Sequence, residues 1–289
     1  MRTNFSAVVT AAFLALALPA TLLAANTVTS CGTVIAKPGT WTVANNLNCS
    51  ALGVAIQVNN VTLILNGFTI TGPGPVSGTG VLVVSPGGFG LKNVKIVGPG
   101  TISAFAAGIL FLGTAGGGAV DLTLSNNGNG LIANFDGNGI QSKSLLITQN
   151  QIVQNVNNGI QGSAINMSSI VGNNASNNGA AAPGGSGIWL AMAATNMVQG
   201  NVCNNNFVDG IRLGGAGGNG ATGNTVVGNQ ANNNVNFGIG LESPTVSDHF
   251  SGNVAFGNAL FDISDSNLSC GSNTYKSDVF GTANQACIK

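Results

Sequence analysis

The side chains that could do chemistry in this sequence are few, because charged residues make up only 6% of its 289 positions. Arg212 is the only arginine after Arg2, and it follows Asp209 by three residues. A guanidinium holds carboxylates through paired hydrogen bonds, and two neighbouring carboxylates can act as the acid and base of a bond cleavage. With Glu242 as the second acid, Asp209, Arg212 and Glu242 form the candidate catalytic group.

Four further residues are candidates for binding a substrate. Trp189 offers a flat aromatic face of the kind that packs on a sugar ring. Gln141, Gln161 and Lys143 supply amide and amino groups that hydrogen-bond hydroxyls or a carboxylate. These residues are scattered over a hundred positions, so they form one site only if the chain repeats and places them on one face.

Two columns of asparagine define such a repeat. In five successive copies an asparagine recurs five residues after another, and the step from the first copy to the second is 23 residues. Cys203 stands two residues after its first-column asparagine, where the other copies have isoleucine or alanine, which predicts a small buried thiol and not a nucleophile. The columns are Asn150, Asn173, Asn201, Asn229 and Asn253, and Asn155, Asn178, Asn206, Asn234 and Asn258.

A fixed period of this length is typical of a solenoid, and its short alternating stretches between Gly and Asn turns indicate strands and not helices. We therefore expect an all-β, single-domain parallel β-helix, right-handed because parallel crossovers have that hand. A leucine-rich repeat would need a leucine framework that this chain lacks. Asn tolerates left-handed turns and can stack in hydrogen-bonded ladders, so most of the asparagines are expected to be structural. Each copy then reaches a Gly-Ile step: Gly159-Ile160, Gly187-Ile188, Gly210-Ile211, Gly238-Ile239 and, with Asp in place of Gly, Asp262-Ile263.

Alternation along a strand places the residue after each inward isoleucine on the outside. If Gly139-Ile140 is an earlier copy, this outward column holds Gln141, Gln161, Trp189, Arg212 and Gly240. Two residues further lie Lys143 and Glu242, and Asp209 precedes its Gly-Ile step. One sheet, the Gly-Ile sheet, is therefore predicted to carry a groove for a polysaccharide. His249 falls on another sheet, and no metal site is predicted from the ligand spacing.

The phrase NNVTLILNGFTITGPG (59–74), the later Gly-Ile repeats and the tail FDISDSNLSCGSNTYKSDVFGTANQACIK resemble the right-handed parallel β-helix repeat proteins of the pectate-lyase-like superfamily. The tail is similar to that of exported bacterial members. The resemblance implies this fold, and the activities it implies include lyases, hydrolases and epimerases. Lyases of the superfamily use an arginine or lysine base and a calcium held by acidic residues, which would make Arg212 the base and calcium the cofactor. A hydrolase would instead pair Asp209 with Glu242.

The N-terminal 25 residues look like a secretory signal peptide, with Arg2, an apolar run and small residues near Ala25. We expect residues 26–289 to form the β-helix domain, with irregular rungs and a cap over 31–138, regular rungs over 139–265 and a C-terminal cap over 266–289. Export to the periplasm or the medium permits disulfides. Their pairing is not fixed by sequence, but Cys31 with Cys49 and Cys270 with Cys287 are close enough to fasten the two ends.

The sequence thus favours an exported protein that binds, and as a further option processes, a polysaccharide along the Gly-Ile sheet. The alternative is a structural or adhesive surface solenoid without a reaction, and a polysaccharide lyase or glycoside hydrolase is the narrower enzymatic hypothesis. The balance of 8 basic and 8 acidic residues gives no electrostatic case for nucleic acid or an anionic membrane. No segment after the signal has the length of a membrane span. The identity of the glycan and the oligomeric state stay open.

Overall fold

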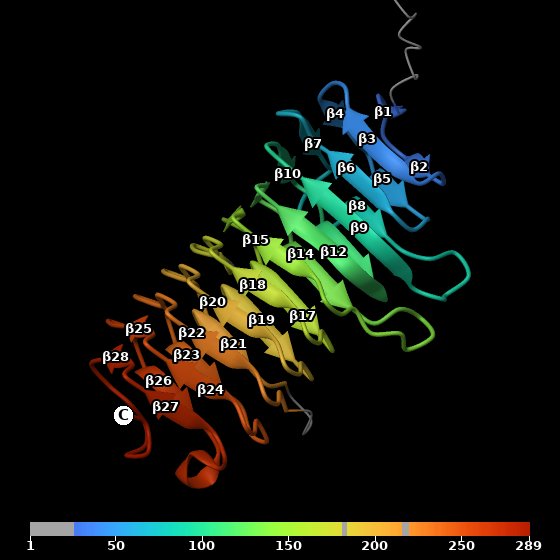
Figure 1. Ribbon diagram of the computed structural model, residues 1–289. Coiled ribbons are helices and arrows are strands. Elements are labelled where there is room, and N and C mark those ends of the chain that lie inside the picture. Colours follow the sequence, from blue (N-terminus) through green and yellow to red (C-terminus); the bar gives the residue numbers. More distant parts are fainter. Residues whose placement is uncertain (1–25, 181–183, 216–219) are drawn as a thin grey trace, which may run out of the picture.

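The computed structural model describes residues 26–180, 184–215 and 220–289. The chain winds into a parallel β-solenoid of about 10 turns, whose rungs stack from the N-terminal end to the C-terminal end (Figure 1). The predicted all-β solenoid is therefore confirmed. The predicted signal peptide, 1–25, lies outside the described residues. Within those ranges no helix is long and apolar enough to cross a membrane.

Three parallel sheets run along the solenoid. Sheet A consists of β1 (Asn26–Val28), β3 (Gly39–Val43), β6 (Val61–Ile64), β9 (Leu91–Val97), β12 (Thr114–Val120), β15 (Leu146–Thr148), β18 (Ser169–Val171), β20 (Met197–Gln199), β22 (Thr225–Val227), β24 (His249–Ser251) and β27 (Thr274–Lys276). Sheet B consists of β2 (Thr33–Ile35), β5 (Leu52–Ile56), β8 (Thr79–Val83), β11 (Ala107–Leu112), β14 (Asn129–Asn134), β17 (Ile160–Ser163), β19 (Ile188–Ala191), β21 (Ile211–Leu213), β23 (Phe237–Leu241) and β26 (Phe261–Asp265). Sheet C consists of β4 (Leu47–Asn48), β7 (Thr69–Thr71), β10 (Thr101–Ser103), β13 (Thr123–Ser125) and β16 (Gln151–Val153), and single bridges continue it to the pair β25 (Val254–Ala255) and β28 (Val279–Phe280).

The interior of the solenoid is filled by stacked columns of apolar side chains. Sheet B supplies two of these columns, one through the isoleucines of the Gly-Ile steps and one through Leu190, Leu213 and Leu241. The isoleucines of the Gly-Ile steps pair rung to rung across sheet B, and each of them is fully buried. Cys203 is also fully buried in the column of Ala175, Ala231 and Ala255, and burial raises the pKa of its thiol. The predicted register of the repeat is confirmed by these pairs.

The two asparagine columns form hydrogen-bonded ladders at two corners of the rung. In the A–C ladder, between sheets A and C, Asn173 Oδ1 accepts from both the backbone N–H (3.0 Å) and Nδ2 (2.9 Å) of Asn150. Asn173 Nδ2 donates to the Ile147 carbonyl at 2.9 Å and to Asn201 Oδ1 at 3.0 Å. The C–B ladder repeats this pattern between sheets C and B, starting at Asn127 and running through Asn155 to Asn258. Each amide therefore satisfies buried backbone groups that the corners take out of the sheets.

Both ladders end on an aspartate. Asp278 Oδ1 accepts from the backbone and the side-chain nitrogen of Asn253, each at 2.8 Å, and Asp262 Oδ1 does the same for Asn258. An ionised carboxylate only accepts hydrogen bonds, so it suits the last rung, where no further acceptor follows. Asp262 and Asp278 therefore cap the two ladders.

A third ladder, the B–A ladder, lies between sheets B and A and was not predicted. Asn196 and Asn224 bond each other there as the other asparagines do, and Asn224 then bonds Asp248 Oδ1. Ser142 and Ser168 take the earlier positions, and Asn273 follows Asp248. The mixture of Ser, Asn and Asp hides this column from a search for one residue type.

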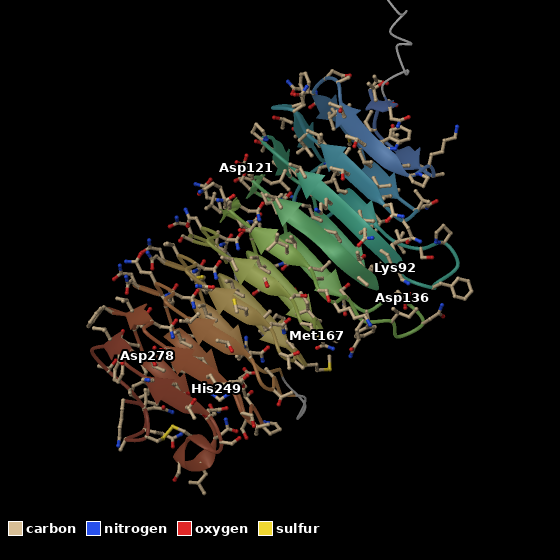
Figure 2. The ribbon with its side chains drawn as sticks, in the orientation of Figure 1. Lys92, Asp121, Asp136, Met167, His249 and Asp278 are labelled. Atoms are coloured by element: carbon tan, nitrogen blue, oxygen red, sulfur yellow. A yellow bond between two sulfur atoms is a disulfide. The ribbon has the colours of Figure 1, made fainter. Side chains whose placement is uncertain are left out.

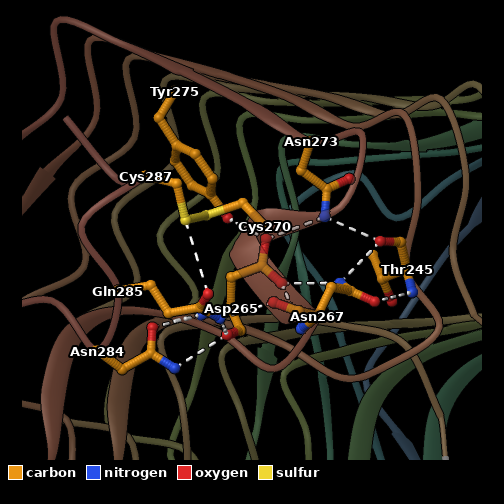
Figure 3. Close-up of a disulfide and its surroundings, with 9 residues drawn as sticks. All are labelled: Thr245, Asp265, Asn267, Cys270, Asn273, Tyr275, Asn284, Gln285 and Cys287. Atoms are coloured by element: carbon orange, nitrogen blue, oxygen red, sulfur yellow. Dashed lines mark hydrogen bonds between the residues drawn. A yellow bond between two sulfur atoms is a disulfide. The ribbon is translucent and has the colours of Figure 1, made fainter.

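Disulfides close both ends of the solenoid. Cys31 is bonded to Cys49, and Cys270 is bonded to Cys287, as expected from their spacing. Figure 3 shows the second bond beside buried Asp265, which accepts from Asn267 and Asn273 and from the Tyr275 hydroxyl at 2.9 Å. By loop length each bond is expected to stabilise the fold by about 3 kcal/mol.

The ladders make a specific prediction about two adjacent asparagines. Asn173→Ala would leave the Asn150 backbone N–H and the Ile147 carbonyl without their side-chain partners in the interior. We expect it to lower the free energy of unfolding by about 2–4 kcal/mol, measured by urea denaturation. The side chain of Asn174 hydrogen-bonds only Gln151, so Asn174→Ala should change stability by about 0.5 kcal/mol or less. Equal effects of the two changes would contradict the structural role of the ladder.

Candidate functional site

The outer face of sheet B carries the predicted site in its C-terminal half. Gln161, Trp189, Arg212 and Gly240 are consecutive partners in the strand register of β17, β19, β21 and β23. Their side-chain positions point away from the interior because the flanking isoleucine and leucine positions are buried. The structure therefore places this part of the predicted column in one row.

The prediction that Gln141 is the first member of this column was wrong. The residue that pairs with Gln161 in the preceding rung is Ile132 of β14, and Gln141 lies instead in the segment that follows this strand. Gly139-Ile140 is not a copy of the Gly-Ile step, because Leu131 pairs with Ile160. Lys143 bridges Asn166 at the approach to sheet A and is likewise absent from the column. The column continues towards the N-terminal end as Ile132, Leu110 and Leu82.

Arg212 is the centre of an ion cluster on this face. Its Nη2 is ion-paired with Glu242 Oε1, and its Nε lies 3.9 Å from Asp209 Oδ2. On the N-terminal side its guanidinium lies over the Trp189 ring, 5.3 Å from the ring centroid. Trp189 Nε1 donates to the Gly214 carbonyl at 2.8 Å, which fixes the plane of the indole. The two carboxylates and the indole together hold the guanidinium in one orientation.

Asp209 differs from its predicted outward position. Its side chain is only 4% exposed, because the residue lies at the corner before β21, where strand alternation does not apply. Its Oδ1 accepts the backbone N–H of Phe237 at 3.1 Å. Burial raises the pKa of Asp209 to about 6, although the Phe237 hydrogen bond and the Arg212 charge both oppose the rise. The Asp209 carboxyl group is thus buried and contacts Arg212 from the side of the interior.

A pocket of about 190 Å³ opens on the C-terminal side of Arg212. The pocket exists because Gly240, next to Arg212 in the row, has no side chain. The Phe237 ring lies over this glycine, and a Cβ added to Gly240 would come within 2.8 Å of the ring. Phe237 in turn stacks on Phe261 of the next rung, with ring centroids 6.5 Å apart. The pocket is lined by Val208, Asp209, Arg212, Asn236, Phe237, Gly240, Leu241, Glu242 and Ser266.

Sequence reasoning missed the aromatic part of this pocket. Phe237 precedes its Gly-Ile step as Asp209 does, but only the polar residue at this position, Asp209, was selected as a candidate. Phe261 belongs to the copy in which Asp replaces Gly, which hides its equivalence to Phe237. The signal that could have found both is their identical spacing from Ile239 and Ile263, two residues before each isoleucine.

The cluster can bind hydroxyl groups and can exchange a proton through Asp209, but it is a poor general base at Arg212. Two carboxylates stabilise the charged guanidinium, whereas a base must give up its proton. Nor do the acidic residues fit a calcium ion, since both contact Arg212 and hard cations need several free oxygen ligands. Across the described ranges, no three His, Cys, Asp or Glu side chains lie close enough to hold a metal ion.

His249 lies where the repeat placed it, away from this pocket. It is exposed in β24 of sheet A, in the row of Leu146, Ser169, Met197 and Thr225 (Figure 2). Its Nδ1 is 2.7 Å from the Thr274 hydroxyl.

A parallel solenoid with a polar and aromatic pocket on one lateral sheet defines a β-helix protein. A family model described as a right-handed beta helix region matches residues 107–279, more than half of the chain, and the protein belongs to this family. The right-handed parallel β-helix family expected from sequence is thereby confirmed. No curated protein matches the sequence significantly.

Solved structures of low sequence identity share the fold. A variant of the periplasmic alginate epimerase AlgG superposes with a TM-score of 0.55 at 13% identity, over 88% of this chain and 73% of that one. The A-module of the Azotobacter vinelandii mannuronan C-5 epimerase AlgE4 gives 0.50 at 13% identity, over 87% and 79%. The enzymatically active domain of bacteriophage CBA120 tailspike protein 2 gives 0.54 at 13% identity, over 77% of this chain but 38% of that one.

The burial of Asp209 predicts an unusual dependence of stability on pH. The folded state holds this proton up to about pH 6, whereas the unfolded state releases it near 3.8. The contribution of Asp209 to the free energy of unfolding is therefore largest at low pH and falls as the pH rises from about 3.8 to 6. We expect the free energy of unfolding of Asp209→Asn, relative to that of wild type, to increase by roughly 2 kcal/mol from about pH 4.5 to 7.5. Urea denaturation of both proteins at the two pH values measures this change.

Asp248, whose pKa burial also raises to about 6, is present in both proteins and cancels from this difference. Asp121→Asn is the matched control, because Asp121 is an exposed turn residue at the edge of sheet A (Figure 2). A difference between Asp209→Asn and wild type that is the same at both pH values would show that Asp209 ionises normally.

Proposed function

We propose that the protein binds a polysaccharide on the outer face of sheet B, at the pocket beside Arg212. The proposal rests on one observation: the same pocket is lined by an ion pair, Arg212 with Glu242, and by an aromatic ring, Phe237. Sugar rings present C–H faces to aromatic rings and hydroxyl groups at their edges to charged hydrogen-bonding groups. In a chain with so few charged residues, this concentration on one sheet is what distinguishes the site from the rest of the surface.

The row geometry supports a polymeric ligand. Gln161, Trp189 and Arg212 lie on consecutive parallel strands, which are spaced about 4.8 Å apart. A chain of sugars along the solenoid axis therefore passes one side chain of the row after another. Similar structures include two epimerases of alginate and mannuronan, which are polysaccharides.

We place this function outside the cytoplasm. Disulfides at both ends of the solenoid persist in oxidising compartments such as the periplasm or the medium. The N-terminal signal pattern supports the same location.

Substitution of the row tests the proposal directly. Trp189→Ala and Arg212→Ala should each weaken binding to the best ligand of a polysaccharide panel by about tenfold or more, because aromatic and arginine anchors dominate such contacts. Affinity electrophoresis of the purified chain measures this. Met197→Ala removes an exposed side chain from sheet A and should leave binding unchanged.

Binding to no member of the panel, or binding that neither row substitution alters, would sink the proposal and favour a structural or adhesive solenoid. Thermal unfolding of each variant shows whether a loss of binding reflects a loss of fold.

Processing of the bound chain is a second candidate, favoured by the raised pKa of Asp209 next to a second carboxylate. If the site hydrolyses its ligand, Asp209→Asn and Glu242→Gln should each reduce the release of reducing ends by about a hundredfold. A lyase would instead raise the ultraviolet absorbance through its unsaturated product. Tight binding by wild type with neither signal would identify a binding protein without catalysis.

A further inference from the structure

We infer that the pocket selects polysaccharides built from neutral sugars and rejects polyuronates, because Arg212 is already neutralised by the protein's own carboxylates. The inference rests on the proposed function and names its ligand class. It also separates this chain from the alginate and mannuronan epimerases that share its fold.

The pocket contains more acidic groups than basic ones. One cation, Arg212, faces two carboxylic acids, Glu242 and Asp209, within the same lining. A uronate carboxylate that approached the guanidinium would also approach Glu242, whose side chain is 34% exposed and shares the rim of the pocket. Juxtaposed like charges of this kind are a common means of excluding the wrong partner.

The rest of sheet B offers no second cation. Among its strands the charged residues are Arg212, Asp262 and Asp265, and the two aspartates cap or brace the final rungs. The lysines of the strands, Lys92, Lys95 and Lys276, belong to sheet A, and Figure 2 shows Lys92 at the edge of that sheet. A polyuronate along the row would therefore repeat its negative charge with no cation on the strands of sheet B other than Arg212.

The same ion pair suits a neutral sugar with neighbouring hydroxyl groups. Glu242 retains lone pairs that accept from one hydroxyl, and Arg212, whose side chain is 28% exposed, retains N–H groups that donate to the next. Gly240 and the Phe237 ring supply an apolar floor against which the C–H face of the ring can pack. A vicinal diol thus satisfies both partners without breaking their ion pair.

The test uses the full mature chain with its disulfides intact and compares polymers that share a backbone and differ at C6, where one member of each pair carries a carboxylate and the other a neutral group. Suitable pairs are mannan with mannuronan, and fully methyl-esterified polygalacturonan with its free acid. We expect wild type to bind the neutral member of at least one pair about tenfold or more tightly than the acidic member. Glu242→Gln keeps the shape of the side chain and frees the charge of Arg212, so it should strengthen binding to the acidic member by about fivefold or more.

Asp121→Asn removes one negative charge far from the pocket and should change neither affinity. Wild-type binding to an acidic polymer as tight as to its neutral partner would overturn the inference while leaving the proposed function in place. An unchanged preference in folded Glu242→Gln would also overturn it, since Glu242 would then not be the selecting group. If wild type and Glu242→Gln both bind none of the polymers, the proposed function itself fails, and the inference falls with it.

Discussion

The buried amide of asparagine, bonded to the rung on either side of it, is the interaction on which this solenoid depends. Each corner of a rung turns the backbone out of its sheet, and the peptide groups there need partners in an interior filled with aliphatic side chains. A primary amide supplies an acceptor and two donors at once, so asparagine meets the need at successive rungs of these corners. The A–C and C–B ladders do so with almost no variation from Asn150 to Asn258.

The ladders also determine where other residues can stand. At the Gly-Ile step the corner lies so close to the C–B ladder that a Cβ on Gly210 would meet Asn234 Nδ2 at 2.8 Å and the Gly238 carbonyl at 2.6 Å. Glycine is therefore required there, and the isoleucine that follows is directed into the core. The residue after the isoleucine is free of these constraints, which is why Trp189 and Arg212 can occupy it.

Much of this was predictable because the A–C and C–B ladders impose one residue type on two of the three corners. The period, the inward isoleucines, the buried Cys203 and the row from Gln161 to Gly240 could all be read from columns. The prediction failed where the columns are interrupted. Gly139-Ile140 has the letters of the step but lies in the segment after β14, and the rung is instead completed by Leu131. Asp209 was misjudged because alternation holds within strands and not at the corner before β21. Phe237, the first residue of β23, was passed over because the candidates there were chosen from polar residue types.

The acceptor-only aspartates at the last rungs have a consequence for the length of the molecule. From Asn150 to Asn258 each rung offers its neighbours the same donors and acceptors at the A–C and C–B corners, so a rung inserted in this region would leave no amide of these two ladders unpaired. Only the ends are unique, with Asp262 and Asp278 terminating the ladders and the Cys270–Cys287 bond closing the cap. The regular part of the solenoid can therefore change in length by whole rungs while its capped C-terminal end stays the same.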